Sequence, residues 1–115
     1  MGRLIKYKDL EIGTGNFPTK GHRIAIHYKI TTPTGDCIDS ENPDDFSRLP
    51  FPTSFRLGLG NVVNGLNRGI QTMRVGGTRV ILISPEMGFG DRGNITADIR
   101  PGESFLVEVH LLESH

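Results

Sequence analysis

Residues 62–90 read VVNGLNRGIQTMRVGGTRVILISPEMGFG, and this stretch decides the fold. Leu66, Ile70 and Met73 recur at the spacing of one face of an α-helix. This stripe predicts a short helix that buries a single apolar face. The rest of the chain contains no second pattern of this kind, so we expect no other helix.

The two ends of this helix carry signals of their own. We expect Asn64 to cap the first turn, because its side-chain oxygen can accept a hydrogen bond from a free backbone amide. Val75–Gly77 should end the helix, since glycine readily adopts a positive φ. Arg79–Ser84 then predicts a buried strand, and Glu86–Gly90 a loop with apolar side chains. This order indicates a sheet wrapped on one helix, with an apolar site at its open end.

Three other stretches alternate between apolar and polar residues, which is the period of a half-buried strand: His22–Thr32, Thr53–Leu59 and Glu103–Glu113. The residues that share the apolar faces are Ile24, Ile26, Tyr28 and Ile30, then Thr53, Phe55, Leu57 and Leu59, then Phe105, Val107, Val109 and Leu111. The last stretch also carries leucines on its other face, so we expect it at the centre of the sheet.

Arg3–Ile12 mixes apolar and charged residues and should form one or two short strands at a sheet edge. Cys37–Ser40 predicts another short strand, while Glu41–Pro52 and Asp91–Gly102 are long loops. The sum is an α+β fold, with a mainly antiparallel sheet of about five strands curled over one short helix. We expect a single domain that spans residues 1–115.

The pattern leaves three side chains with two interpretations each. Tyr28 is either a core tyrosine whose hydroxyl finds a backbone partner, or a pocket wall. Asp39 is either a turn or capping aspartate, or a partly buried carboxylate beside a pocket. One aromatic ring of the first long loop, Phe46 or Phe51, is expected to be held against the body of the domain.

Composition excludes several classes of protein. Lys and Arg together number 13, as do Asp and Glu, so the formal charge is zero and neither nucleic acid nor a membrane surface is an expected partner. The single cysteine, Cys37, cannot form an internal disulfide. No run approaches the length of a membrane span, and no signal-peptide pattern opens the chain. We expect a cytoplasmic monomer, with a trimmed targeting segment or further domains as the alternative.

The familiar catalytic motifs are missing. The four histidines show no metal-ligand spacing, and the chain contains no G-x-S-x-G motif and no nucleotide-binding glycine pattern. An enzyme built from this sequence would work without a nucleophile, a metal or a cofactor.

Short motifs follow one another in a specific order between Tyr7 and Glu113, nearly the whole chain. They are His27-Tyr28, Asp39-Ser40, Phe55-Arg56-Leu57-Gly58, Val62-Val63-Asn64-Gly65-Leu66, Gly69 with Met73-Arg74-Val75-Gly76-Gly77, Ile83-Ser84-Pro85 with Gly88-Phe89-Gly90, Ile99-Arg100-Pro101 and Leu106-Val107-Glu108-Val109. In this combination the chain resembles the FKBP family, the macrolide-binding peptidyl-prolyl cis–trans isomerases.

The resemblance implies a shallow apolar pocket between the sheet and the helix. The catalytic residues that it implies are Tyr28, Asp39 and Phe89, with Asp39 adding electrostatic or hydrogen-bond stabilisation. The residues that it implies for substrate binding are Ile38, Phe51, Val62, Val63, Leu66, Ile99 and Val107. The family's loop aromatic corresponds to Phe51 or to Thr53, and its loop arginine has no clear match.

An apolar pocket suits this reaction because no proton needs to move. An Xaa-Pro amide isomerises by twisting out of plane, over a barrier of about 18–20 kcal/mol. The twisted amide has a less polarised carbonyl than the planar amide. A water-poor apolar site therefore favours the twisted form relative to the planar form.

Four positions depart from the family pattern, and three of them lose an aromatic ring. Leu66 stands where tryptophan is usual, Phe89 where tyrosine is usual, and Ile38 and Val107 where phenylalanine is usual. The lost aromatic area and the lost hydrogen bond should weaken the binding of macrolides such as rapamycin more than the turnover of proline peptides. We expect a peptidyl-prolyl isomerase that acts on Xaa-Pro bonds of proteins. The alternative is an FKBP-like protein-binding module with weak or no isomerase activity.

Overall fold

The computed structural model describes residues 5–115, so Arg3 and Leu4 of the predicted first strand lie outside the described residues. The described residues form six strands, one α-helix and two 3₁₀ turns. In order they are β1 (Lys6–Glu11), β2 (Arg23–Thr31), β3 (Cys37–Asp39), η1 (Pro43–Arg48), β4 (Ser54–Arg56), α1 (Asn64–Gln71), β5 (Thr78–Ile83), η2 (Pro85–Met87) and β6 (Phe105–Ser114).

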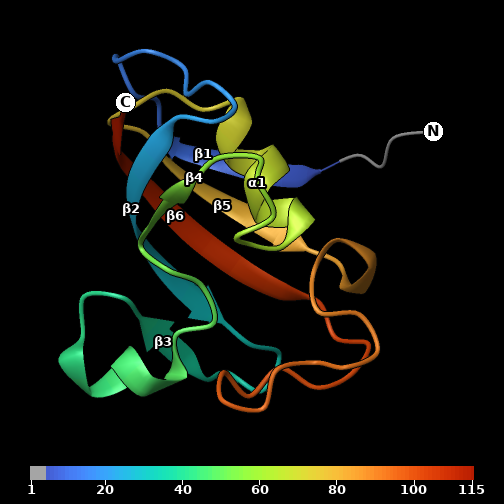
Figure 1. The fold of residues 1–115 in the computed structure, drawn as a ribbon. Helices are drawn as coiled ribbons and strands as arrows, with labels where there is room; N and C mark the ends of the chain where they lie inside the picture. Colours follow the sequence, from blue (N-terminus) through green and yellow to red (C-terminus); the bar gives the residue numbers. More distant parts are fainter. Residues whose placement is uncertain (1–4) are drawn as a thin grey trace.

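The strands form one antiparallel sheet in the order β1–β5–β6–β2–β3, and β4 pairs with β2 (Figure 1). The central position of β6 and the edge position of β1 confirm two predictions. The α+β class is also confirmed. The sheet has six strands rather than about five, because the short stretch after the first long loop adds β4 to β2.

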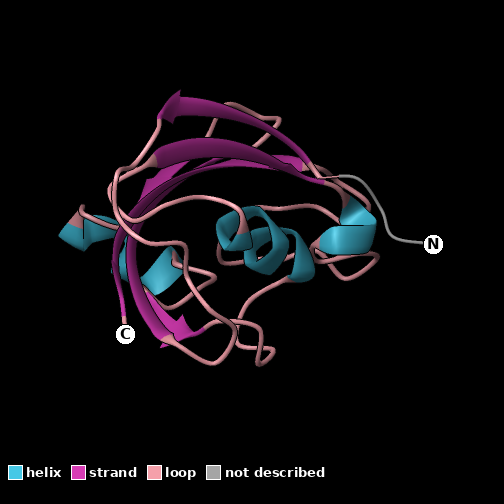
Figure 2. Cartoon of the chain, turned by 90° about the horizontal axis from the view of Figure 1, so that it is seen from above, coloured by secondary structure: helices cyan, strands magenta, loops and turns pink. Residues whose placement is uncertain are grey.

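The sheet curves around α1, which lies in its concave side (Figure 2). Alternate residues of β2 face this side, and Ile26, Tyr28 and Ile30 are each at most 1% exposed. Phe105 and Val107 of β6 are buried in the same way. The predicted inward faces of β2 and β6 are therefore confirmed, and they form the hydrophobic core together with α1.

Two glycines let α1 approach β5 closely. A Cβ atom on Gly69 would lie 2.4 Å from Cδ1 of Ile81, and one on Gly65 would lie 2.7 Å from Cδ1 of Ile83. Both isoleucines are completely buried, so neither can move aside into solvent. The spacing of these glycines in the helix thus fixes α1 on the sheet.

The prediction that Asn64 caps the helix was wrong. Asn64 is the first residue of α1, and Val63 holds the capping position without a side-chain hydrogen bond. The carbonyl of Val63 accepts the amide of Asn67 at 3.2 Å, so the backbone itself begins the helix. At the other end α1 stops at Gln71, before the predicted stop, and Gly76 then turns the chain with a φ of 93°.

The predicted apolar face of the stretch before the helix was half wrong. Phe55 and Leu57 are buried, but Thr53 and Leu59 are exposed. The extended backbone ends early because Gly58 adopts a φ of 80°, which breaks the alternation after Leu57.

The expectation of one helix missed two 3₁₀ turns in the predicted loops. In η1 the side-chain oxygen of Asn42 accepts the amide of Asp44 at 3.1 Å, and Pro43 starts the turn. Proline favours such a start because its fixed φ suits the first turn.

Of the helices in residues 5–115, none is long and apolar enough to cross a membrane.

Candidate functional site

Loops from three parts of the chain meet at one end of the sheet. They are residues 32–36 between β2 and β3, residues 40–53 with η1, and residues 84–104 between β5 and β6, at the lower end of Figure 1. The long strands β2 and β6 adjoin these loops, since β2 ends at Thr31 and β6 begins at Phe105. Side chains from a rigid scaffold and from loops thus come together here, which is the usual setting of a binding site.

Nine of the ten residues predicted for the site lie in or against the apolar core. Seven are in the buried cluster and at most 8% exposed: Tyr28, Ile38, Phe51, Val62, Leu66, Ile99 and Val107. Val63 and Phe89 are partly buried and pack against it. The structure therefore places these nine in or against one apolar cluster, the hydrophobic core of the domain, and buries seven of them.

The ring of Phe51 occupies the middle of an aromatic group. It stacks on Phe89 with centroids 5.7 Å apart and planes 6° apart, and on Phe105 at 6.5 Å. The ring of Tyr28 makes a tilted contact with it, with centroids 5.6 Å apart and planes 56° apart. Offset and tilted ring pairs of this kind are favourable contacts. Phe51, only 3% exposed, thus fills the apolar space beneath the loops.

The hydroxyl of Tyr28 binds the backbone of Phe51 twice. It donates to the carbonyl of Phe51 at 2.5 Å and accepts the amide of Phe51 at 3.2 Å. Burial raises the pKa of Tyr28 to about 12, against a smaller lowering by the hydrogen bond to the carbonyl of Phe51. The hydroxyl therefore stays protonated at neutral pH. Tyr28 is both a core tyrosine with a backbone partner and a wall of the cluster.

Asp39 is the one predicted residue that the structure does not bring into the cluster. It pairs with Lys29 across β2 and β3, so the two side chains share the outer face, while Ile38 faces the core. Its carboxylate accepts the amide of Glu41 at 2.9 Å. The outward position of Asp39 follows from the inward position of Ile38, because neighbouring residues of a strand point to opposite faces.

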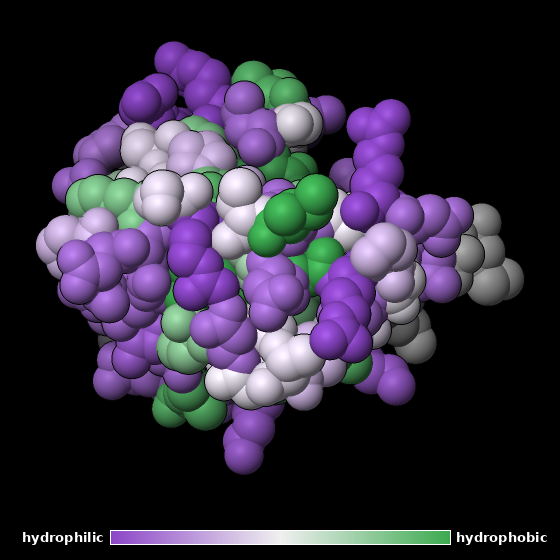
Figure 3. All heavy atoms as spheres, turned by 90° about the horizontal axis from the view of Figure 1, so that it is seen from below, coloured by the Kyte–Doolittle hydropathy of each residue, from purple (hydrophilic) through white to green (hydrophobic). Residues whose placement is uncertain are grey.

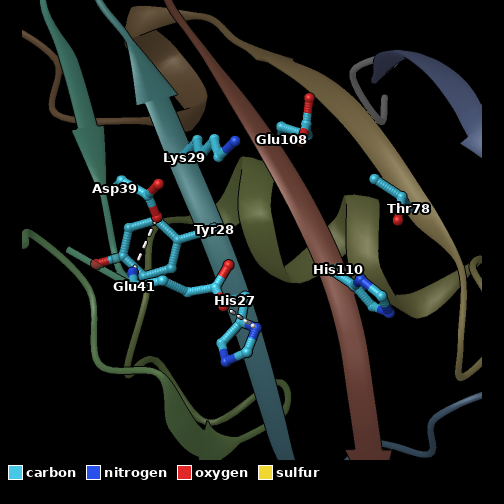
Figure 4. A pocket seen from close by; sticks show the side chains of 8 residues that line it. All are labelled: His27, Tyr28, Lys29, Asp39, Glu41, Thr78, Glu108 and His110. Atoms are coloured by element: carbon cyan, nitrogen blue, oxygen red, sulfur yellow. Dashed lines mark hydrogen bonds and ion pairs between the residues drawn. The ribbon is translucent and has the colours of Figure 1, made fainter.

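The outer face has a polar hollow of about 130 Å³ beside Asp39 (Figure 4). It is lined by His27, Tyr28, Lys29, Asp39, Glu41, Thr78, Glu108 and His110. The ring of His27 lies 3.3 Å from the carboxylate of Glu41. Within residues 5–115, no group of three or more His, Cys, Asp or Glu side chains is placed to hold a metal ion. The hollow is thus a charged surface of the sheet.

Arg48 is a residue of the loop end that the sequence did not reveal. Its guanidinium binds the carboxylate of Asp36 and donates to the carbonyl of Thr96 at 3.2 Å. This pairing holds the pKa of Asp36 below its usual value. Arg48 joins all three loops, and its partners could not be read from the sequence because they are 12 and 48 residues away.

The outer side of residues 40–54 is open to solvent. A groove of about 640 Å³ is lined there by Ser40, Phe46, Leu49, Pro50, Phe51, Pro52, Thr53 and Ser54. The ring of Phe46 is 58% exposed, so Phe51 and not Phe46 is the loop aromatic held against the body. Seen from the loop end in Figure 3, hydrophobic areas are small and separated by hydrophilic ones.

Comparison with known proteins assigns this arrangement to a family. The family described as FKBP-type peptidyl-prolyl cis-trans isomerase matches residues 14–112. The chain belongs to this FKBP family. This membership confirms the family resemblance of its sequence motifs.

Relatives cover the FKBP domain over nearly its whole length. An FK506-binding protein of Neisseria meningitidis is 36% identical over 113 residues, which are 98% of this chain and 97% of the relative. FK506-binding protein 1 of Dictyostelium discoideum is 34% identical over 100 residues, or 87% and 88% of the two chains. The crystal structure of AtFKBP13 superposes with a TM-score of 0.82 at 28% identity, covering 96% of this chain and 93% of that one.

Proposed function

We propose that this FKBP domain is a peptidyl-prolyl cis–trans isomerase acting on Xaa-Pro bonds of proteins at the apolar cluster. The observation that carries the proposal is the cluster itself, in which Tyr28 of β2, Leu66 of α1 and Val107 of β6 are all buried together. Its walls are apolar, and the protonated hydroxyl of Tyr28 already binds a peptide carbonyl there.

The proposed catalysis follows from the polarity of these walls. A planar amide has a strongly polarised carbonyl and loses solvation when it enters an apolar site. The twisted transition state is less polarised and loses less, so the barrier falls. Phe89, which faces the cluster, supplies part of the apolar surface, and Tyr28 orients the peptide through its hydroxyl. No metal, cofactor or proton transfer is required.

The test is the cis-to-trans rate of a short peptide that contains Leu-Pro-Phe, with and without the protein, by NMR exchange. Uncatalysed exchange takes about 10–100 s, so an acceleration is easily measured. We expect acceleration that depends on protein concentration. A folded protein that leaves the rate unchanged at micromolar concentration would contradict the proposal.

A second candidate is a protein-binding module with weak turnover, and the filling of the cluster by Phe51 favours it. Peptide binding without acceleration would select this candidate.

We also propose that macrolides bind weakly, because Leu66 and Phe89 reduce the aromatic and hydrogen-bonding surface. A nanomolar dissociation constant for rapamycin would contradict this. A monomeric state and a cytoplasmic location stay predictions, to be checked by size-exclusion chromatography and by cell fractionation.

A further inference from the structure

The side chain that fills the site belongs to a segment rich in proline. Residues 49–52 read Leu-Pro-Phe-Pro, so the buried ring of Phe51 lies between two prolines. The hydroxyl of Tyr28 holds the amide and the carbonyl of Phe51, which are groups that any peptide offers. The segment therefore contacts the cluster through one side chain and its backbone groups, as a bound peptide would.

Phe51 differs from the cluster residues of the strands and the helix in being removable. Tyr28, Leu66 and Val107 stand on β2, α1 and β6, where leaving the cluster would break the fold. Phe51 stands on a loop, and it is the single fully buried residue between Glu41 and Ser54.

The loop has defined anchors on both sides of Phe51. Thr53 is fixed by its carbonyl, which accepts the amide of Ile26 at 2.8 Å. On the other side η1 contains no buried residue, and Arg48 holds it through contacts that are about one-third exposed. The segment can thus swing out about Thr53 once the ring leaves, without unpairing β2.

We propose that Leu49–Pro52 is an internal ligand of the isomerase site, and that the site takes peptides in which an aromatic residue adjoins a proline, in competition with this segment. The inference rests on the proposed function, since it assigns the same cluster to the substrate. It adds that the substrate must displace Phe51 before it can bind.

This competition should lower the apparent affinity for a peptide by a measurable factor. Minor conformations of proteins are commonly populated at about 0.1–10%. A ligand that binds only the open form has its apparent affinity reduced by that fraction. Removing the ring of Phe51 should therefore raise kcat/KM for a Leu-Pro-Phe peptide by about 10-fold or more.

The experiment compares the wild type with Phe51→Ala and with Phe17→Ala. Phe17 is 52% exposed and stacks only on the guanidinium of Arg74, so Phe17→Ala removes an aromatic ring without touching the site. Each protein is assayed for turnover of the Leu-Pro-Phe peptide and titrated with it by NMR, following the amide signals of Leu66 and Ile99. Phe51→Leu, which keeps an apolar side chain, replaces Phe51→Ala if the latter does not fold, with a smaller gain expected.

A peptide copy of the segment supplies a second measurement. The acetylated amide of Arg-Leu-Pro-Phe-Pro-Thr, the sequence of residues 48–53, should bind Phe51→Ala at least 10-fold more tightly than the wild type and inhibit its turnover. In the wild type the internal copy already occupies the site.

The outcomes separate the two proposals. Faster turnover in Phe51→Ala, with Phe17→Ala at the wild-type rate, supports both. Equal turnover in all three proteins, or slower turnover in Phe51→Ala alone, overturns the internal ligand and leaves the isomerase. If no protein is active but Phe51→Ala binds the peptides more tightly, the proposed isomerase activity is contradicted and the proposed internal ligand is supported. If activity is absent and binding is equal, both proposals fall.

Discussion

Two arginines join neighbouring segments at opposite ends of this domain, and their side chains differ in burial. Arg79 of β5 lies where α1 ends, and its side chain is 5% exposed. It donates to the carboxylate of Asp9 at 2.7 Å, to the carbonyl of Gly69 at 2.8 Å and to the hydroxyl of Thr72 at 2.6 Å. Arg48 at the loop end is about one-third exposed. Arginine is thus a buried residue of the core at one end of the domain, and a partly exposed link between loops at the other.

The difference shows where the domain is rigid and where it can move. A buried guanidinium must have its hydrogen bonds satisfied, because an unpaired buried charge is very costly. Arg79 therefore binds the edge strand β1 and the end of α1 into one body. An exposed pair is exchanged for water at little cost. On this basis we expect the loops at Arg48 to open while the sheet and helix remain folded, which the proposed binding of a peptide in the cluster requires.

The largest effect that we expect is on the buried end. Arg79→Met should lower the free energy of unfolding by about 3 kcal/mol, because Asp9 and the helix carbonyl lose their shared donor. Chemical denaturation measures this. Arg74→Met is the matched control, since the guanidinium of Arg74 is exposed and binds the carbonyl of Gly15; it should cost less than about 1 kcal/mol. Equal losses in the two variants would remove the distinction between a buried and an exposed arginine.

A smaller loss of stability is expected where α1 touches β5. Gly69→Ala places a methyl group 2.4 Å from Cδ1 of Ile81. Overpacking of a core costs about 1–3 kcal/mol, and the higher helix propensity of alanine returns about 1 kcal/mol. We expect a net loss of about 0–2 kcal/mol. Adding Ile81→Val should recover part of it, and a double variant no more stable than Gly69→Ala would contradict the steric explanation.

Sequence periodicity predicted the scaffold much better than the contents of the site. The faces of β2 and β6 follow from alternation, and Leu66 and Ile70 follow from helical spacing, because such patterns are local. Phe51 lies in a proline-rich loop without periodicity, so its burial depends on Tyr28 and Phe89, which are distant in sequence. The partners of Arg79 and Arg48 are likewise set by the fold, and composition alone could not identify them.

At the exposed end, Arg48→Ala should quicken amide exchange in residues 94–99 while shifting the unfolding midpoint less than Arg79→Met does. The reason is that its contacts with Asp36 and Thr96 are accessible to water. Arg56→Ala is the control, because Arg56 is exposed and binds the carbonyl of Gly21 away from these loops. A midpoint shift as large as that of Arg79→Met would show that the loops belong to the rigid body.

The effect of Arg48→Ala should also depend on pH. The pKa of Asp36 is lowered in the folded protein, chiefly by the hydrogen bond from Arg48. The stability that the pair contributes is therefore fully present above the ordinary aspartate value of 3.8 and is lost as the pH falls through the lower folded pKa. Wild type and Arg48→Ala should differ equally at pH 7 and pH 5, and the difference should shrink in strong acid, where the bond of Arg48 to the carbonyl of Thr96 remains.

The smallest effect concerns the two faces of β3. In the arrangement described, Ile38 faces the cluster and Asp39 faces outward beside Lys29. If the apolar walls carry the catalysis, Asp39→Ala should change kcat/KM by about twofold or less, as surface substitutions do. Asp39→Asn, which keeps an acceptor for the amide of Glu41, separates charge from hydrogen bonding. A tenfold loss in both variants would mean that the carboxylate turns into the site during turnover, and the outward position would then be a feature of the Phe51-filled state.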